Sequence, residues 1–109
     1  MKAWDYLEEY NNHRTEILRI VDEVFKSGQL ILSASVNDFE KNFAQYLGVK
    51  YAIGVNSGTD ALLIALKTLG IGYGDEVITV ANTAVPTVSA IVTAGAIPRF
   101  VDIDPDTYL

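Results

Sequence analysis

The chain has 109 residues, of which 50% are apolar and 20% are charged, and this composition excludes an intrinsically disordered protein. Eight basic residues against fourteen acidic ones give a net charge of −6, which argues against nucleic acid or an anionic membrane surface as a partner. Cysteine is absent and His13 is the only histidine, which excludes disulfides, cysteine-ligated metals and multi-histidine metal sites. The first residues contain no apolar run typical of a secretory signal, so a cytoplasmic location is expected by default.

Residues 1–50 are predicted to form a helical N-terminal segment. From residue 3 to residue 27, apolar side chains recur at three- and four-residue spacing, which indicates one amphipathic helix. Gly28 stands where such a helix ends, because glycine readily adopts the left-handed conformation of a helix C-terminus. The short apolar segment 29–32 that follows is expected to be extended.

A second helix is expected over residues 37–47. Asn37 is followed three residues later by Glu40, a pattern that resembles a capping box at a helix start. Gly48 directly follows the last apolar residue of this segment and is expected to end the helix.

After residue 50 the pattern changes to an alternation of strands and helices. The expected elements are a strand at 51–55, a helix at 59–69, a strand at 76–81, a helix at 86–94 and a strand at 99–102. Strands that alternate with helices of about ten residues indicate βαβ crossovers and a parallel sheet. The predicted fold class is therefore α/β, with N-terminal helices followed by βαβαβ in residues 51–109.

The segment from Val77 through Pro98 contains no charged residue. A membrane span is a poor interpretation, because polar residues, Pro86 and Gly95 interrupt the segment. A parallel strand can be apolar on both faces, but a surface helix of a small domain normally has a polar face. The helix at 86–94 offers only hydroxyl groups, so we expect it to be covered, and little of this chain is left to cover it.

The loop Asn56–Asp60 joins the first expected strand to a helix and is a candidate anion site. Unpaired backbone N–H groups and the helix dipole favour an anion there, Gly58 permits close approach, and Ser57 and Thr59 add hydroxyl donors. The alternative is an ordinary serine N-cap in a turn, and on local sequence this alternative is favoured. The loop has no lysine and is not a Walker A motif.

Two further loops follow expected strands. Asn82–Ala84 stands at the carboxyl end of the second strand, where open α/β sheets usually bind ligands, although it also fits a polar loop before a helix. Asp102 and Asp104 follow the third strand, and a turn-forming role is favoured over metal binding because no other ligands accompany them. No metal site is predicted.

Taken in order, the segments of the chain resemble the nucleotide-sugar aminotransferases of the DegT/DnrJ/StrS type, which are fold-type I pyridoxal-phosphate enzymes. The segments that carry the resemblance are 27–32 (SGQLIL), 39–44 (FEKNFA), 55–62 (VNSGTDAL), 69–78 (LGIGYGDEVI) and 95–104 (GAIPRFVDID). The resemblance implies that the chain is the start of the large, cofactor-binding domain of such an enzyme, with the parallel sheet of residues 51–109 incomplete.

The resemblance also implies a cofactor site for pyridoxal 5′-phosphate. Gly58, Thr59 and Asp60 would hold the cofactor phosphate through backbone amides and the Thr59 hydroxyl, with Ser57 in the same loop. The family usually places an aromatic residue that stacks on the pyridine ring at the position of Ala84, and here that contact is lost.

The function implied is amino transfer, with glutamate as the amino donor, to a nucleotide-linked keto-6-deoxysugar, and the wording of segment 81–87 is similar to members acting at C3 of dTDP-linked sugars. A homodimer is implied as well. Two alternatives remain open: a short, non-catalytic relative that serves as an interaction module, and a sugar dehydratase in which histidine replaces the catalytic lysine. A free-standing receiver-like α/β domain is disfavoured, because it needs about five strands.

Transamination needs a lysine amine and a carboxylate at the pyridinium nitrogen of the cofactor. The lysines of the chain are Lys2, Lys26, Lys41, Lys50 and Lys67. None of them follows the carboxyl end of an expected strand, so no catalytic residue is assigned. We expect this chain to be the N-terminal part of a longer enzyme and to be inactive alone.

Overall fold

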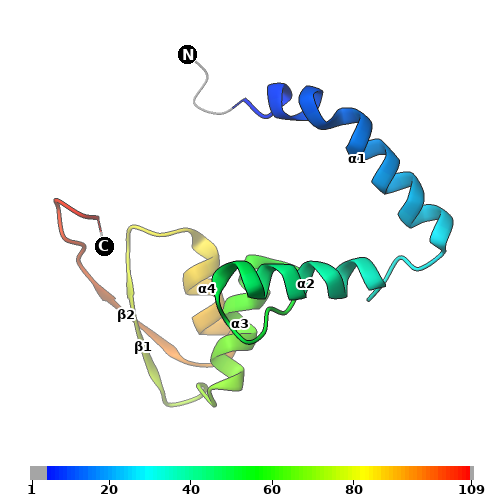
Figure 1. Cartoon of the computed structure of the whole chain (residues 1–109). Helices are drawn as coiled ribbons and strands as arrows, with labels where there is room; N and C mark the ends of the chain where they lie inside the picture. Colours follow the sequence, from blue (N-terminus) through cyan, green and yellow to red (C-terminus); the bar gives the residue numbers. More distant parts are fainter. Residues whose placement is uncertain (1–4, 109) are drawn as a thin grey trace. The chain divides into compact units, whose positions relative to one another are not determined.

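A computed structural model of the chain describes residues 5–108 (Figure 1). These residues divide into two compact units, one ending at Ile53 and the other beginning at Gly54. Each unit is described by itself below.

The first unit contains two helices. Helix α1 (Leu7–Ser27) carries the amphipathic pattern expected from the sequence, and none of its residues is buried. It ends at Gly28, whose φ of 68° is left-handed and whose N–H donates to the Phe25 carbonyl, as the position of this glycine predicts. The expected first residues of this helix, 3 and 4, lie outside the described residues. No helix of the described part is both long and apolar enough to cross a membrane.

Helix α2 (Ala34–Leu47) begins one turn earlier than predicted. Ser33 is its N-cap, and the Asn37 N–H already donates to the Ser33 carbonyl at 3.2 Å, so Asn37 lies inside the first turn and is not the cap. The predicted extended segment 29–32 was also wrong. The chain bends there, and Leu32 has a left-handed φ of 48° directly before the cap.

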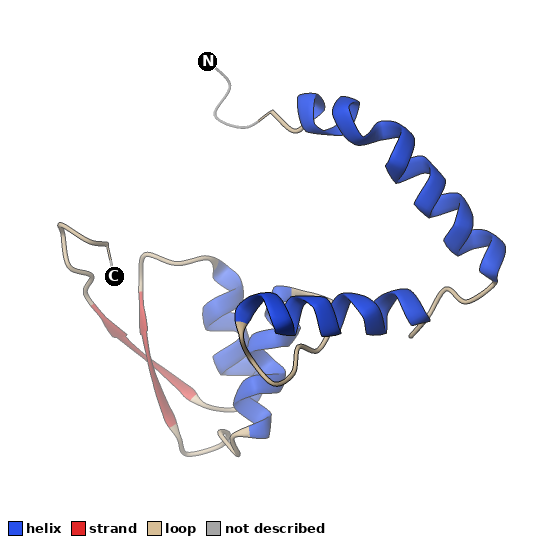
Figure 2. Cartoon of the chain, viewed as in Figure 1, coloured by secondary structure: helices blue, strands red, loops and turns tan. Residues whose placement is uncertain are grey.

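The second unit packs two helices against a short two-stranded sheet. Helix α3 (Gly58–Thr68) comes first, and strand β1 (Glu76–Val80), helix α4 (Val85–Ala94) and strand β2 (Ile97–Val101) complete a βαβ unit (Figure 2). The two strands pair in parallel, with Val77 opposite Pro98. The predicted parallel connection through an α-helix is therefore present.

The strand predicted at 51–55 is absent from the structure. The sheet of the described residues has two strands, β1 and β2, and residues 51–55 form no ladder with either. Apolar β-propensity alone does not make a strand, because a strand is stabilised by hydrogen bonds to a neighbour. The observed order in this unit is therefore αβαβ in place of βαβαβ.

Pro98 was expected to precede the last strand, yet it lies inside β2. The Ile97 N–H donates to the Asp75 carbonyl at 2.9 Å, so the backbone of Ile97 faces β1. Successive residues of a strand face opposite edges, so the nitrogen of Pro98 faces away from β1. Proline is tolerated there because no hydrogen bond of this ladder is lost.

The uncharged helix α4 forms the core of the second unit. Its residues Ala90, Ile91 and Ala94 are buried, and so is Ala96, which follows the helix. Helix α3 and both strands contact α4. The expectation that little of this chain could cover the helix was therefore wrong for its inner face, whereas Val85 and Val92 remain exposed.

Helices α3 and α4 lie side by side and run in the same direction (Figure 1). The Lys67 ammonium group, near the end of α3, donates to the carbonyl of Ala94, the last residue of α4, at 2.7 Å. The carboxyl ends of the two helices are thus joined, and both helices begin at the opposite end. This arrangement brings the two candidate loops, 56–60 and 82–84, to one end of the unit.

Candidate functional site

Ser57 is the N-cap of α3. Its backbone is extended, with φ −156° and ψ 163°, and its Oγ accepts a hydrogen bond from the Asp60 N–H at 3.1 Å. A serine cap of this kind satisfies one of the amides that a helix start leaves without an internal partner. The ordinary N-cap expected as one alternative is therefore present.

The carboxylate of Asp60 organises the loop before the helix. Its Oδ2 accepts hydrogen bonds from the Asn56 amide at 3.0 Å and from the Ser57 hydroxyl at 2.8 Å. These two donors, Asn56 first and Ser57 second, lower the pKa of Asp60 below its ordinary value. The side chain is therefore a carboxylate at neutral pH.

The amides of Gly58 and Thr59 remain available at the start of α3. Neither N–H has a hydrogen-bond partner among the described residues, because the first amides of a helix have no carbonyl one turn earlier within it. The serine cap serves the Asp60 N–H, and the Ser57 carbonyl accepts from Ala61. A Cβ built on Gly58 would meet no atom beyond its chain neighbours within 4 Å, so open space lies where a side chain of this residue would point. An anion can reach two free donors and the positive end of the helix dipole here, and this arrangement suits a phosphate group.

The second loop leads into α4. Ala84 is the N-cap of that helix, is exposed, and offers no side-chain hydrogen bond. The hydroxyls of Thr83 and Thr87 lie 2.9 Å apart across the first helical turn. The structure therefore places Ala84 at the same end of the unit as the Asn56–Asp60 loop, with a methyl group where the resemblance leads us to expect an aromatic ring.

The acidic residues after β2 form a turn. The Asp104 carboxylate accepts hydrogen bonds from the N–H groups of Asp106 and Thr107, at 2.8 and 2.9 Å, and Asp102 accepts one from Ile103. The bonds from Thr107 and then Asp106 lower the pKa of Asp104. This geometry confirms the predicted turn. Within residues 5–108 no group of three or more potential metal ligands comes together.

The described lysines have partners within their own units, and Lys67 is the one that belongs to the second unit. Lys26 and Lys41 pair with acidic residues of their own helices, Asp22 and Asp38, and Lys50 lies 5.0 Å from the centre of the Tyr51 ring. Lys67 is bound to the Ala94 carbonyl at the far end of α3. Lys2 lies outside the described residues.

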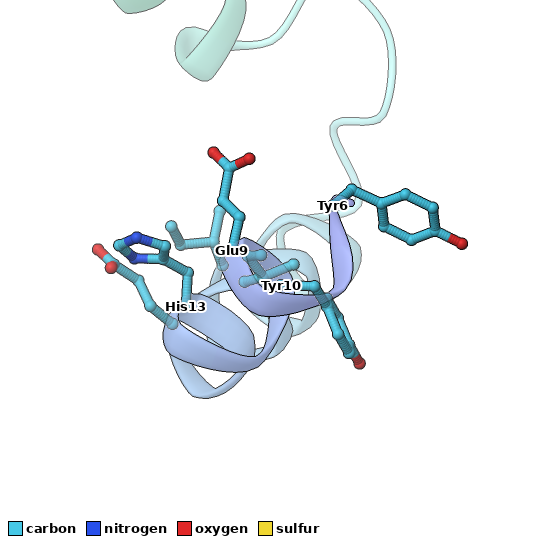
Figure 3. Close-up of a pocket in the computed structure, with 7 residues that line it drawn as sticks. Tyr6, Glu9, Tyr10 and His13 are labelled. Carbon is cyan, nitrogen blue, oxygen red and sulfur yellow. The ribbon is translucent and has the colours of Figure 1, made fainter. Parts of the chain in front are cut away.

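Two hollows were not predicted from the sequence. One, of about 450 Å³, runs along an exposed face of α1 that includes His13. Figure 3 shows Glu9, Tyr10 and His13 projecting from this helix and Tyr6 from its N-cap. The other, of about 170 Å³, is an apolar cavity in the second unit. It is lined by residues of α3, β1 and α4, namely Leu62, Ala65, Leu66, Leu69, Val77, Ile78, Thr79, Thr87 and Ile91. Neither hollow includes a residue of the Asn56–Asp60 loop.

Solved structures with the same fold include an aminotransferase and a dehydratase. A DegT DnrJ EryC1 StrS aminotransferase from Brucella abortus matches 99% of this chain with a TM-score of 0.95 and 36% identity. An E. coli GDP-4-keto-6-deoxy-D-mannose-3-dehydratase, solved with bound hydrated pyridoxal phosphate, also matches 99% of the chain, with a TM-score of 0.77 and 29% identity. The predicted fold class, the beginning of a fold-type I aminotransferase, is thereby confirmed.

The amino-acid sequence identifies the family. Residues 11–109 match the DegT/DnrJ/EryC1/StrS aminotransferase family, and the chain belongs to this family. A dTDP-3-amino-3,4,6-trideoxy-alpha-D-glucose transaminase of Micromonospora megalomicea subsp. nigra is 50% identical over 98% of this chain. A dTDP-3-amino-3,6-dideoxy-alpha-D-galactopyranose transaminase of Aneurinibacillus thermoaerophilus is 44% identical over 88% of it.

The chain spans less than a third of the length of these relatives. It covers 29% and 26% of the two transaminases and 29% and 27% of the two solved chains. The match to the family is therefore a match to between a quarter and a third of the length of these relatives.

Proposed function

We propose that the chain forms the phosphate-binding part of a pyridoxal-phosphate-dependent aminotransferase that acts on a nucleotide-linked keto-6-deoxysugar. The observation that carries this proposal is the pair of unpartnered amides at the start of α3, those of Gly58 and Thr59. A free N–H pair at a helix start is the backbone geometry that favours a phosphate monoester.

The residues of the loop divide the work. The amides of Gly58 and Thr59 and the Thr59 hydroxyl would donate to the cofactor phosphate, while Ser57 caps the helix behind them. When bound, pyridoxal phosphate supplies the electron sink for amino transfer. The chain's own contribution would be to hold the phosphate end, because Lys67, the described lysine of the second unit, is bound to Ala94 at the far end of α3. At the second loop, Ala84 leaves the ring position without an aromatic contact.

The substrate proposal follows the relatives. Both transaminases named above carry dTDP-3-amino sugars in their names, which favours a dTDP-linked 3-keto-6-deoxysugar as the acceptor. Glutamate as the donor, a homodimer and the cytoplasmic location remain predictions.

A second candidate is a sugar dehydratase, because the E. coli GDP-4-keto-6-deoxy-D-mannose-3-dehydratase has the same fold over this segment. The two functions differ in the residue at the lysine position of the family, which this chain does not contain. Sequencing the genomic reading frame past Leu109 separates them: lysine in a strand-following loop supports the aminotransferase, and histidine there supports the dehydratase. A stop codon at that point would favour a short interaction module and contradict the catalytic proposal.

The phosphate site itself is tested by amide NMR on the full chain. Pyridoxamine 5′-phosphate is the probe, because it lacks the aldehyde that reacts with surface lysines, and pyridoxamine without phosphate is the control. We expect the Gly58 and Thr59 amide signals to shift with the phosphorylated probe and to remain unmoved by the control. Shifts that are absent at this loop, or equal with both compounds, would contradict the proposal.

A further inference from the structure

The loop that presents the two free amides also contains a carboxylate, that of Asp60, whose charge and hydrogen-bonding capacity do not suit contact with a phosphate. Asp60 is anionic at neutral pH, since its two hydrogen-bond donors lower its pKa. A carboxylate only accepts hydrogen bonds and has the same sign of charge as a phosphate, so it gains nothing by contact with one.

The backbone of Asp60 is not available either. Its N–H donates to the Ser57 Oγ at 3.1 Å, which removes it from the set of free donors. Both ways in which this residue could touch the phosphate, through its amide or through its side chain, are therefore closed.

The carboxylate instead fixes two neighbouring side chains. One oxygen, Oδ2, accepts from Asn56 at 3.0 Å and from Ser57 at 2.8 Å, and the Ser57 Oγ in turn accepts from the amide of Asp60. The Ser57 hydroxyl thus donates its proton to the carboxylate and accepts a hydrogen bond from the Asp60 N–H. It cannot donate to a phosphate while this ring of bonds is intact.

We propose that Asp60 is a positioning residue of this loop: through Asn56 and Ser57 it fixes the backbone that presents the free amides, and it makes no bond of its own to the phosphate. This inference rests on the proposed function and assigns direct contact to Gly58 and Thr59 alone. Of the four loop residues expected at the cofactor site, Gly58 and Thr59 would then contact the phosphate, and Ser57 and Asp60 would support them.

The test compares two neutral variants of the full chain, D60A and D60N, in the pyridoxamine 5′-phosphate titration. Both variants lose the negative charge, but asparagine keeps an acceptor oxygen for Asn56 and Ser57. We expect the dissociation constant of D60A to be about fivefold higher than that of D60N, the effect typical of losing one hydrogen bond. D60N should bind within about twofold of the parent chain, because a nearby exposed charge contributes little.

Equal binding by D60A and D60N would overturn the inference, and so would a D60N variant whose binding is weaker than that of the parent chain by clearly more than about twofold. Failure of the proposed function has a different signature, namely that the parent chain shows no phosphate-dependent shifts at Gly58 and Thr59. In that case the inference about Asp60 is also overturned.

A second measurement needs no ligand and serves if D60A does not fold. In S57A the carboxylate loses one of its two donors, so the pKa of Asp60, followed by carboxyl ¹³C NMR, should rise toward its ordinary value. A control variant, S27A, removes a serine hydroxyl that bonds to Val24 in α1 and should leave this pKa unchanged. An Asp60 pKa that does not move in S57A would overturn the inference.

Discussion

Two glycines of the second unit show how the same residue type serves different purposes. Gly58, the first residue of α3, has no positive φ and open space where a side chain would point. Gly95 has a φ of 93°, and a Cβ there would lie 3.4 Å from the Tyr73 nitrogen. The backbone therefore requires glycine at position 95 but not at position 58, where the role that we propose for glycine is access by a ligand.

This contrast makes a prediction for the alanine variants. G58A should unfold at the same temperature as the parent chain or slightly higher, since alanine restricts the unfolded state, yet it should weaken binding of pyridoxamine 5′-phosphate. G95A should lose at least about 1 kcal/mol of unfolding free energy because of its left-handed backbone. Thermal unfolding and the NMR titration measure the two effects. A G58A variant that binds as well as the parent chain would contradict the assigned role.

The hydroxyl of Thr59 is the second group of the loop that can be tested directly. In T59V the shape is kept and one donor is lost, so we expect phosphate binding to weaken by about fivefold while the unfolding temperature stays within a few degrees. T93V is the matched control, because Thr93 lies in α4, near the end opposite the loop. The proposal would be contradicted if both variants bound the probe like the parent chain.

The site could be predicted in outline but not in its bonding. Helix capping is local, and the order Ser57, Gly58, Thr59 is enough to place free amides at a helix start. Ser57 followed by Asp60 is also a capping-box pattern, and this signal could have predicted their mutual bond. That the carboxylate takes the Asn56 amide as well depends on side-chain rotamers that the sequence does not specify.

At the scale of elements, Lys67 links the ends of two helices. Its ammonium group donates to the last carbonyl of α4, where the negative end of the helix dipole also favours a cation. Because both candidate loops lie at the other end of these helices, this bond helps to fix where the loops stand relative to each other.

We expect K67M to lower the unfolding free energy by about 1 kcal/mol, the usual value of one such hydrogen bond, since methionine keeps much of the apolar stem and removes the donor. Chemical denaturation followed by circular dichroism measures the change. K26M is the control, because Lys26 makes only an exposed ion pair with Asp22 in α1. Similar losses in both variants would mean that the bond to Ala94 has no special weight.

The elements themselves could be predicted where their signals are local. Helices α1, α3 and α4 lie close to the predicted ranges, since apolar periodicity and glycine stops act within a few residues. Residues 51–55 were predicted as a strand wrongly, because strand formation depends on a partner far along the chain. The start of α2 was misplaced since two cap signals, Ser33 and Asn37, stand one turn apart and the longer helix gains backbone hydrogen bonds.

At the scale of the whole molecule, three carboxyl groups predict how stability depends on pH. Hydrogen bonds or an ion pair lower the pKa of Asp60, Glu76 and Asp104 in the folded chain; for Glu76 the main cause is its hydrogen bond from Arg99. A lowered pKa stabilises the fold above the unfolded value, about 4, and this contribution is lost as the pH falls through the folded value. We therefore expect the unfolding free energy to decrease on acidification below about pH 5.

Denaturant titrations at a series of pH values measure this slope. D104N should flatten it, because asparagine keeps an acceptor for the turn but does not titrate. A free energy of unfolding that rises on acidification would contradict the assignment.

The chain as a whole should lack the lysine chemistry of its family. Mixed with pyridoxal phosphate, it should develop no stoichiometric, lysine-dependent visible absorption band. None of its described lysines follows the carboxyl end of a strand, and Lys67, the described lysine of the second unit, is bound at the end of α3 opposite the candidate loop. Absorption spectra of the parent chain and of K50R and K67R, each with and without the cofactor, provide the measurement. A band that one lysine substitution abolishes would show that the chain does carry the reactive amine.

Pro98 determines which edge of this two-stranded sheet can pair with a further strand. Along the edge of β2 that faces away from β1, position 98 offers a ring nitrogen where a neighbouring strand needs a donor. An incoming strand would therefore meet a missing bond on the β2 side, whereas the outer edge of β1 carries no proline. Additional strands, from whatever source, are expected to join at β1, so a single imino acid makes β2 a terminus of the sheet and discourages uncontrolled edge-to-edge association.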